Sequence, residues 1–124
     1  MKSLFALAIL LLAVSLRAAA QDMVRVAPEL CKVILENESV RVIDVRVKPG
    51  DVVPMHSHGN AVTYCVSPGA SKTTTPDGKT VEAQFKAGEA RWSGPVTHAN
   101  ESTTNLHLVV VELKENRGTS GRKK

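Results

Sequence analysis

The chain has 124 residues, a formal net charge of +4 at pH 7 and only 3% aromatic residues. That length accommodates one domain of ordinary size rather than two. The positive charge comes from the ends of the chain: residues 21–116 carry 10 basic and 12 acidic side chains, because two basic residues precede them and four follow. Since nucleic-acid binding requires a basic face with interleaved aromatic side chains, we do not expect it here.

The first 20 residues have the order of a secretory signal peptide. Lys2 precedes an apolar run over residues 4–16, and Ala18-Ala19-Ala20 supplies the small residues of a cleavage site before Gln21. The run of 13 residues is shorter than the roughly 18 to 20 needed to span a bilayer, so a membrane anchor is the weaker interpretation. We expect an exported protein, secreted or periplasmic, whose mature form begins near Gln21 and has no membrane span.

Beyond residue 30, short β-branched runs separated by turn residues predict an all-β domain. The expected strands, in chain order, are 31–35, 40–47, 62–66, 71–75, 80–85, 89–92 and 106–113. The sequence Pro76-Asp77-Gly78 predicts a hairpin between two of these runs, because Asp-Gly favours a tight turn. About eight short antiparallel strands must close into a single barrel or form a two-sheet jelly roll to protect their edges.

This pattern divides the chain into four segments. They are the signal peptide (1–20), a lead-in (21–30), the β domain (31–114) and a basic tail (115–124) that we expect to be disordered. The β domain and its lead-in contain two cysteines, Cys31 and Cys65. In an exported protein they permit one disulfide, but two buried thiols on separate strands are an equally open interpretation.

Histidines provide the main functional signal. His56 and His58 are two residues apart on an extended segment, so their side chains share a face about 6.5 to 7 Å apart and can converge on one ion. Two histidines do not make a tight site, and His98, which is expected at a turn signalled by Gly94-Pro95, is the candidate third ligand. A pair of this kind, taken alone, is as often a surface or core pair as a metal site.

Two stretches around these histidines resemble the motifs of the cupin superfamily. Residues 49–69 resemble the first motif, in which Gly50 is followed by five residues and then by the His-x-His pair. Residues 88–101 resemble the second motif, which closes on His98. The resemblance covers residues 31–114, nearly the whole of the expected mature domain.

The resemblance implies a jelly-roll β-barrel whose mouth contains His56, His58 and His98 as ligands of a divalent transition metal: Fe, Zn, Ni, Cu or Mn. The sequence departs from the family pattern at two points. Metal-binding cupins carry a glutamate four or five residues after the second histidine, where this chain has Val62 and Thr63. The customary late asparagine of the second motif falls at Ser102, with Asn100 and Glu101 nearby.

Losing the carboxylate changes the metals that the site favours. Three neutral imidazoles disfavour hard Mn and Mg ions and suit Fe, Ni, Cu and Zn. An all-histidine set with open positions resembles the centres of the thiol and diketone dioxygenases among cupins, and also zinc sites that hold an ionisable water. The opposing interpretation is that the glutamate and the metal were lost together.

Residues near the histidines were assigned from strand alternation. If alternation continues past His58, Val62 and Tyr64 share the face of the histidines, and Tyr64 is either a proton relay near the ion or a residue packed at the rim. Trp92 is expected in the barrel core, and Met55 on the face opposite His56. His107 is expected at the rim or facing solvent.

Three functions remain open from the sequence. The first is a metal-dependent, dioxygenase-like enzyme acting on a small molecule. The second is a non-catalytic barrel that binds a small molecule or an ion, and the third is an interaction protein, since barrel edge strands readily pair in homodimers. No evident general base except Glu101 accompanies the motif positions, which favours redox chemistry or binding over hydrolysis.

Overall fold

A computed structural model describes residues 21–115 of the chain. The predicted signal peptide (1–20) and residues 116–124 of the predicted tail lie outside the described residues. The elements, in chain order, are α1 (Met23–Val26), β1 (Cys31–Glu36), β2 (Val40–Val47), β3 (Val52–His58), β4 (Ala61–Ser67), β5 (Gly69–Thr74), β6 (Thr80–Phe85), β7 (Ala90–Ser93), β8 (Val96–Ser102) and β9 (Leu106–Leu113).

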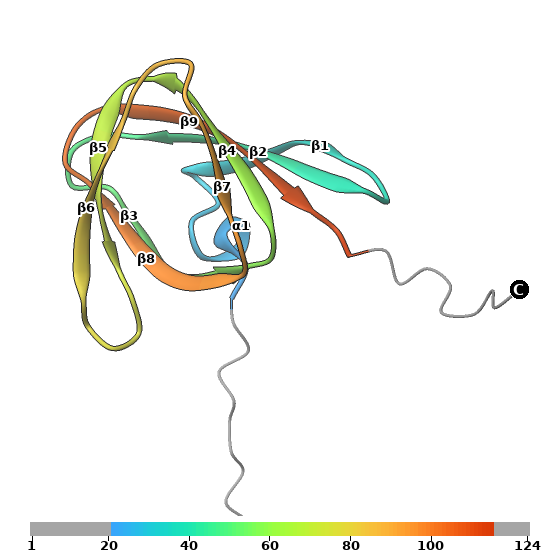
Figure 1. Ribbon diagram of the computed structural model, residues 1–124, viewed down its shortest axis with the longest axis horizontal. Helices are drawn as coiled ribbons and strands as arrows, with labels where there is room; N and C mark the ends of the chain where they lie inside the picture. Colours follow the sequence, from blue (N-terminus) through green and yellow to red (C-terminus); the bar gives the residue numbers. More distant parts are fainter. Residues whose placement is uncertain (1–20, 116–124) are drawn as a thin grey trace, which may run out of the picture.

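The strands form two antiparallel sheets that face each other around a common interior (Figure 1). One sheet has the order β1-β2-β9-β4-β7 and the other has the order β3-β8-β5-β6. No ladder joins the two sheets among residues 21–115, so the domain is a two-sheet jelly roll rather than a hydrogen-bonded closed barrel. The predicted all-β jelly roll is confirmed.

Three strands, β2, β6 and β9, begin and end where the sequence predicted, and the alternation between the two faces is clearest in β2. In β2, Ile43, Val45 and Val47 are buried, whereas Asp44 and Arg46 lie on the outer face. The predicted hairpin joins β5 to β6, with Gly78 at φ 85°, a conformation that glycine adopts without strain.

Three elements were not among those expected: β3, whose residues were described only as an extended segment, β8 and α1. Strand β8 was interpreted as a turn because its residues, Val96 to Ser102, are mostly polar; they are polar because the strand lines a cavity instead of a dry core. The lead-in was not expected to be helical, but it forms one turn of helix, α1. The side chain of Asp22 caps this turn by accepting a hydrogen bond from the backbone N–H of Val24 at 2.8 Å.

The two cysteines are free and buried. They lie in one cross-strand row of the five-stranded sheet, in which Cys31 pairs with Val45, Val45 with Leu108, and Leu108 with Cys65. Three strand spacings separate them by about 14 Å, twice the roughly 7 Å that a disulfide can bridge. Burial raises the pKa of the Cys31 thiol to about 11, so this side chain is an unreactive core residue.

The helix α1 lies between the sheets at one end of the domain (Figure 1). Met23 and Ala27 are buried in the hydrophobic core. The backbone carbonyl of Gln21 accepts a hydrogen bond from the N–H of Ser57 at 2.9 Å, which fixes the start of the segment against β3. No helical segment within residues 21–115 has the length and apolar character that crossing a membrane requires.

Candidate metal centre

Two neighbouring strands bring the three predicted ligands together. His56 and His58 lie on β3, and His98 lies on β8 directly opposite His56 in the antiparallel ladder. The register of β3 shifts between Val53 and His56, and this irregularity changes the phase of the strand. As a result Val53 and His56, three residues apart, both point to the interior, and His56 is only 1% exposed.

The three rings surround a common point. Their centroids are 4.8 Å apart for His56 and His98, 5.2 Å for His58 and His98, and 6.1 Å for His56 and His58. One ring nitrogen of each residue lies within 4.8 Å of the other two. An ion bound at about 2.1 Å would hold these nitrogens about 3 to 3.5 Å apart, so the rings need to approach by only about 1 to 2 Å.

Backbone carbonyls fix which nitrogen is available in two of the rings. Nδ1 of His56 lies 2.8 Å from the carbonyl oxygen of Pro54, and Nδ1 of His58 lies 2.8 Å from that of Gly59. Because a carbonyl can only accept, each Nδ1–H is the donor, and the lone pair of the ring remains on Nε2. This is the arrangement by which proteins orient metal-binding histidines.

The environment keeps two of the imidazoles, those of His56 and His98, uncharged at neutral pH. Burial, together with the charges of protonated His56 and His58, lowers the pKa of His98 to about 4. The pKa of His56 is also lowered, chiefly by burial, although its hydrogen bond to Pro54 opposes the shift. Neutral rings are the form that binds a metal, so the donor set fits a divalent transition-metal ion.

Thr63, and not Val62, occupies the inward position at which a glutamate ligand would stand after the second histidine. In β4, Ala61 and Cys65 are buried and Thr63 points with them to the cavity. Val62 pairs with Val111 and Trp92 on the outer face of the sheet. The expectation that Val62 shares the face of the histidines is therefore wrong, because the turn at residues 59–60 begins a new strand with its own phase.

The same change of phase places Tyr64 outside the site. Tyr64 is 45% exposed and does not line the cavity, so it takes neither of the two expected places, beside the ion as a proton relay or packed at the rim. Trp92 was expected in the core but is 63% exposed, since it lies outward on the edge strand β7 and only borders the cavity. His107 faces outward, where its Nε2 is 2.5 Å from Oδ1 of Asp44. Met55 is exposed, as predicted.

The histidines open into a cavity of about 230 Å³ between the sheets. Its apolar wall includes Val45, Val47, Val53, Phe85, Leu106, Leu108 and Val110, and its polar wall includes Ser71, Thr73, Asn100 and Ser102. Asn100 donates a hydrogen bond to Oγ1 of Thr73 at 2.9 Å. Glu101, the general base considered from the sequence, is exposed and absent from the lining.

The carboxylate that does line the cavity, Asp51, is far from the histidines. It precedes His56 by five residues along the chain at the start of β3, a separation of roughly 15 Å in extended backbone. Its side chain accepts a hydrogen bond from the backbone N–H of Lys48 at 2.8 Å. Among the described residues, no carboxylate of the cavity wall is therefore placed to act beside the three rings.

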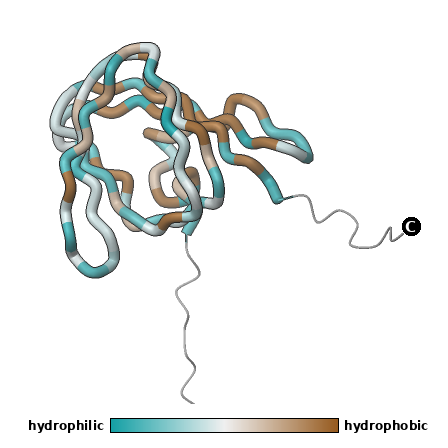
Figure 2. The backbone as a smooth tube through the Cα atoms, in the orientation of Figure 1, coloured by the Kyte–Doolittle hydropathy of each residue, from teal (hydrophilic) through white to brown (hydrophobic). Residues whose placement is uncertain are grey.

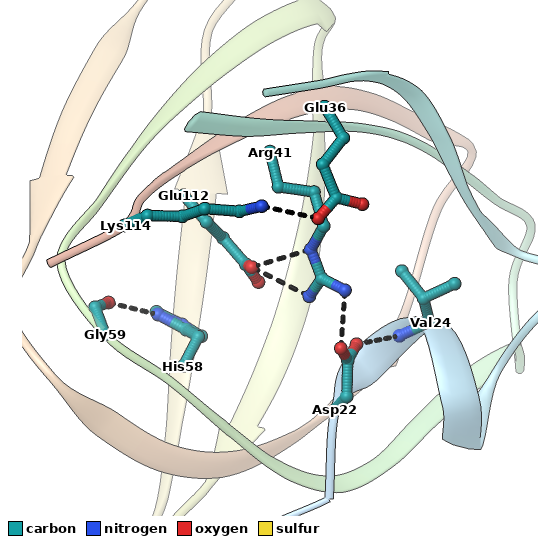
Figure 3. A network of polar contacts seen from close by, with 8 residues as sticks. All are labelled: Asp22, Val24, Glu36, Arg41, His58, Gly59, Glu112 and Lys114. Atoms are coloured by element: carbon teal, nitrogen blue, oxygen red, sulfur yellow. Dashed lines mark hydrogen bonds and ion pairs between the residues drawn. The ribbon is translucent and has the colours of Figure 1, made fainter. Parts of the chain in front are cut away.

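An ion network that the sequence analysis missed lies at the histidine end of the interior (Figure 3). Arg41 donates from Nε and Nη2 to Glu112 Oε2 at 3.0 and 2.7 Å, and from Nη1 to Asp22 Oδ2 at 2.5 Å. One cation thus faces two carboxylates, whose net negative field raises the pKa of His56 against the lowering by burial. This field also favours a bound cation. One feature of the sequence could have revealed the network. Glu112 is a charged residue at a position that strand alternation places on the same inward face as Leu106, Leu108 and Val110.

Comparison with solved structures is consistent with this geometry. A cupin domain from Bordetella pertussis Tohama I superimposes with a TM-score of 0.63 and 28% identity, over 68% of this chain and 92% of that chain. This chain folds as a small cupin domain. The expected resemblance is confirmed, and the cupin motifs lie where the three histidines meet.

Two further structures share the fold. An RmlC-like cupin protein from Desulfovibrio desulfuricans has a TM-score of 0.54 at 18% identity, over 67% of this chain and 79% of that chain. A double-stranded β-helix protein from Klebsiella pneumoniae has a TM-score of 0.54 at 22% identity, over 71% and 78%. No family model matches the cupin domain in sequence, and no curated protein does.

Proposed function

We propose that this cupin domain binds a divalent transition metal through His56, His58 and His98, and holds a small, mainly apolar molecule in the adjoining cavity. The observation that carries the proposal is the convergence of three imidazoles, two of which donate Nδ1–H to a backbone carbonyl. Three neutral nitrogen ligands favour Fe, Ni, Cu or Zn over Mn.

The enzymatic form of this proposal is a dioxygenase-like oxidoreductase. A three-histidine set leaves coordination positions open, and a bound redox metal supplies the electron-transfer or Lewis-acid chemistry. The chain's own residues would orient a small molecule between the apolar and polar walls of the cavity. Because no carboxylate of that wall lies beside the rings, hydrolysis by a carboxylate base is the less favoured reaction.

The same lack of a carboxylate in the cavity wall beside the rings favours, as the second candidate, a barrel that binds without turnover. Oxygen consumption by the metal-loaded protein, measured with small thiols and diketones, distinguishes the two. Oxygen uptake that depends on both substrate and metal supports the enzyme. A protein that binds these compounds without consuming oxygen supports the binding module.

Elemental analysis tests the metal proposal directly. Protein purified without nickel affinity, then stripped with chelator and reloaded separately with Fe, Ni, Cu, Zn or Mn, should retain close to one ion per chain for the favoured metals. Each retained ion should raise the midpoint of thermal unfolding, because it binds the folded state alone. Retention no higher than that of a His56→Ala variant for every metal would contradict the proposal.

Acidification should release the metal. Protons compete for the ring nitrogens, and ordinary histidines do so near pH 6.5. Since the pKa of His56 is lowered and that of His98 is about 4, competition at these two rings should extend to lower pH than for free imidazole. We expect full occupancy at about pH 7.5 and progressive loss between about pH 6.5 and 4. Metal content after dialysis at each pH, with circular dichroism to monitor folding, measures this loss; constant occupancy down to about pH 4 would contradict histidine ligation.

We further propose that the protein is exported, on the basis of Lys2, the apolar run over residues 4–16 and the small residues before Gln21. Cleavage there would leave Gln21 as the first residue of the mature chain. N-terminal sequencing of protein from the exported fraction should start within a residue or two of Gln21. An exported protein that retains Met1 would disprove the cleavage.

A further inference from the structure

The two sheets give the cavity walls of different polarity. Figure 2 shows β5 and β8 of the four-stranded sheet mostly in teal and white, whereas brown stretches run along β2 and β9 of the facing sheet. The cavity lining follows this division: β5 and β8 contribute hydroxyl, amide and imidazole groups, and β2 and β9 contribute valines and leucines. A molecule in the cavity therefore meets hydrogen-bonding groups on one side and apolar surface on the other.

Register gathers the polar side chains into one patch. Ser71 lies directly opposite Ser102 in the ladder between β5 and β8, and Thr73 lies opposite Asn100. Direct partners in an antiparallel pair have Cβ atoms about 4.5 to 5.5 Å apart. We call these four residues the polar wall. His98 also lines the cavity and precedes Asn100 by two residues on β8, so the polar wall begins next to the histidines and extends away from them.

The protein leaves a buried hydroxyl of the polar wall unpaired. Ser71 is only 6% exposed and lines the cavity, yet its hydroxyl has no hydrogen-bond partner within residues 21–115. No side-chain nitrogen or oxygen that is sealed inside this part of the chain lacks a partner, so the Ser71 hydroxyl opens into the cavity. Because buried polar groups are rarely unsatisfied, its partner must come from the contents of the cavity.

Two neighbours of Ser71 offer further free groups. Nδ2 of Asn100 donates to Oγ1 of Thr73 at 2.9 Å, which leaves the O–H of Thr73 free to donate and Oδ1 of Asn100 free to accept. Ser102 differs, because its hydroxyl already donates to the carbonyl of Thr104 at 2.5 Å. The polar wall thus presents both free donors and a free acceptor to one region of the cavity.

The charged side chains of the lining do not favour an acid. Arg91 donates from Nε and Nη2 to the carboxylate of Glu89 at 2.9 and 3.0 Å, and its guanidinium lies 4.3 Å from the centre of the Phe85 ring. Apart from the histidines, the other charged residue of the described lining is the anion Asp51, which would repel a carboxylate. A buried carboxylate without a cation is costly, so the group that fits the polar wall is uncharged.

We propose that the small molecule bound here is an alcohol, whose hydroxyl binds the polar wall and whose other end lies at the histidines; this inference rests on the metal-binding function proposed above. A hydroxyl both donates and accepts, so it can donate to Oδ1 of Asn100 and accept from Ser71 or Thr73. A carboxylate or a ketone only accepts and would leave Asn100 without its donor. The carbon chain between the two ends lies against the valines and leucines of the apolar wall.

The spacing of the wall sets the length of the alcohol. Ser71 stands opposite Ser102, four residues beyond His98, which is about 13 Å along a strand. A hydrogen bond of about 3 Å places the ligand hydroxyl roughly 10 Å from the level of His98. A metal-bound sulfur spans about 2.3 Å of this distance. A thiol and a hydroxyl joined by about five carbons therefore reach from the metal to the polar wall.

Three thiols of matched length test the polar wall on zinc-loaded protein, because zinc binds thiolate and is not redox-active. Mercaptopentanol ends in a hydroxyl, mercaptopentanoic acid in a carboxylate and hexanethiol in a methyl group. Isothermal titration calorimetry measures their dissociation constants. We expect mercaptopentanol to bind about tenfold more tightly than mercaptopentanoic acid, or better. An acid that binds as tightly as the alcohol would overturn the proposal.

Ser71→Ala is the matched variant and Thr74→Ala its control. Thr74 lies on the same strand but outside the cavity lining, where its hydroxyl bonds to that of Thr80 at 3.1 Å. We expect Ser71→Ala to weaken mercaptopentanol by about three- to tenfold without weakening hexanethiol, and Thr74→Ala to change neither. If Ser71→Ala weakened both thiols equally, or neither, the hydroxyl would not bind the polar wall and the proposal would be wrong.

Metal content, measured on the same samples, distinguishes failure of this proposal from failure of the metal centre. Protein that retains zinc but does not prefer the alcohol contradicts the alcohol alone. Protein that retains no zinc contradicts the metal centre, and pentanol and pentanoate are then compared on the metal-free protein by NMR titration. A preference for pentanol that Ser71→Ala abolishes would still support the polar wall as an alcohol site. Equal binding of pentanol and pentanoate would overturn it.

Discussion

Replacing His98 by alanine is expected to lower the affinity for the favoured transition metal by about 100-fold or more. His98 is the only ligand candidate that β8 contributes, and it faces His56 across the ladder. Without it, His56 and His58 would remain as two ligands on one strand, which do not enclose an ion. Competition with a chromophoric chelator measures the loss. The variant should also lose the metal-induced rise in melting temperature, because that stabilisation grows with the ratio of metal concentration to dissociation constant.

The fourth histidine provides the matched control. His107 lies on the outer face of β9 and bonds to Asp44 instead of pointing to the cavity. His107→Ala removes an imidazole and its hydrogen bond to Asp44 but should leave metal affinity within about twofold of the parent. Equal losses in His98→Ala and His107→Ala would mean that metal binds to the surface. If His98→Ala bound the metal as tightly as the parent, the proposal of a three-histidine centre would be wrong.

The fold and the ligand set could be predicted because they depend on local, periodic features. The β-branched runs of β2, β6 and β9 are bounded by turn residues, so the sequence locates their ends, and β2 in addition alternates between a buried and an exposed face. His56 and His58 share a face for the same reason. His98 was found by its resemblance to a motif, since the polar residues around it on β8 carry no strand periodicity.

The details of the site could not be predicted because they depend on which residues of each strand face the interior. The irregularity between Val53 and His56 moves the histidines to the inner face, and the turn at residues 59–60 resets β4 so that Thr63 points inward. A shift of one residue exchanges the two faces of a strand, which explains the errors at Val62 and Tyr64. Trp92 was misassigned for another reason: size and hydrophobicity suggested core, but its strand is an edge whose outer side remains open.

The ion network could not be predicted because its members are distant in sequence. Asp22, Arg41 and Glu112 meet only after α1 folds back against the sheet. Their assembly also explains why the lead-in is ordered: Asp22 caps α1 and at the same time pairs with Arg41. The segment immediately before the domain is thus part of the histidine end of the interior, and any cleavage near Gln21 occurs beside the site.

Adding a carboxylate at Thr63 should change the metal preference of the site. Thr63 is partly buried and points to the cavity, five residues after His58 in the chain. Thr63→Glu supplies an anionic oxygen, which hard ions prefer, so we expect Mn(II) affinity to rise by about tenfold or more. In the metal-free variant the new carboxylate lacks a partner, and the free energy of unfolding should fall by about 1 to 3 kcal/mol. Binding of Mn(II) should recover that loss.

Val62→Glu is the control, because it tests whether Thr63 or Val62 is the residue of β4 that faces the histidines. Val62 lies on the outer face between Val111 and Trp92, so a glutamate there cannot reach the histidines. Thermal unfolding with and without Mn(II) should therefore show stabilisation by the ion in Thr63→Glu only. If Mn(II) stabilised Val62→Glu instead, the assignment of strand phase would be wrong. If Thr63→Glu unfolded and no metal restored it, Thr63 would be a packed core position, and the three histidines would not surround an open ligand site.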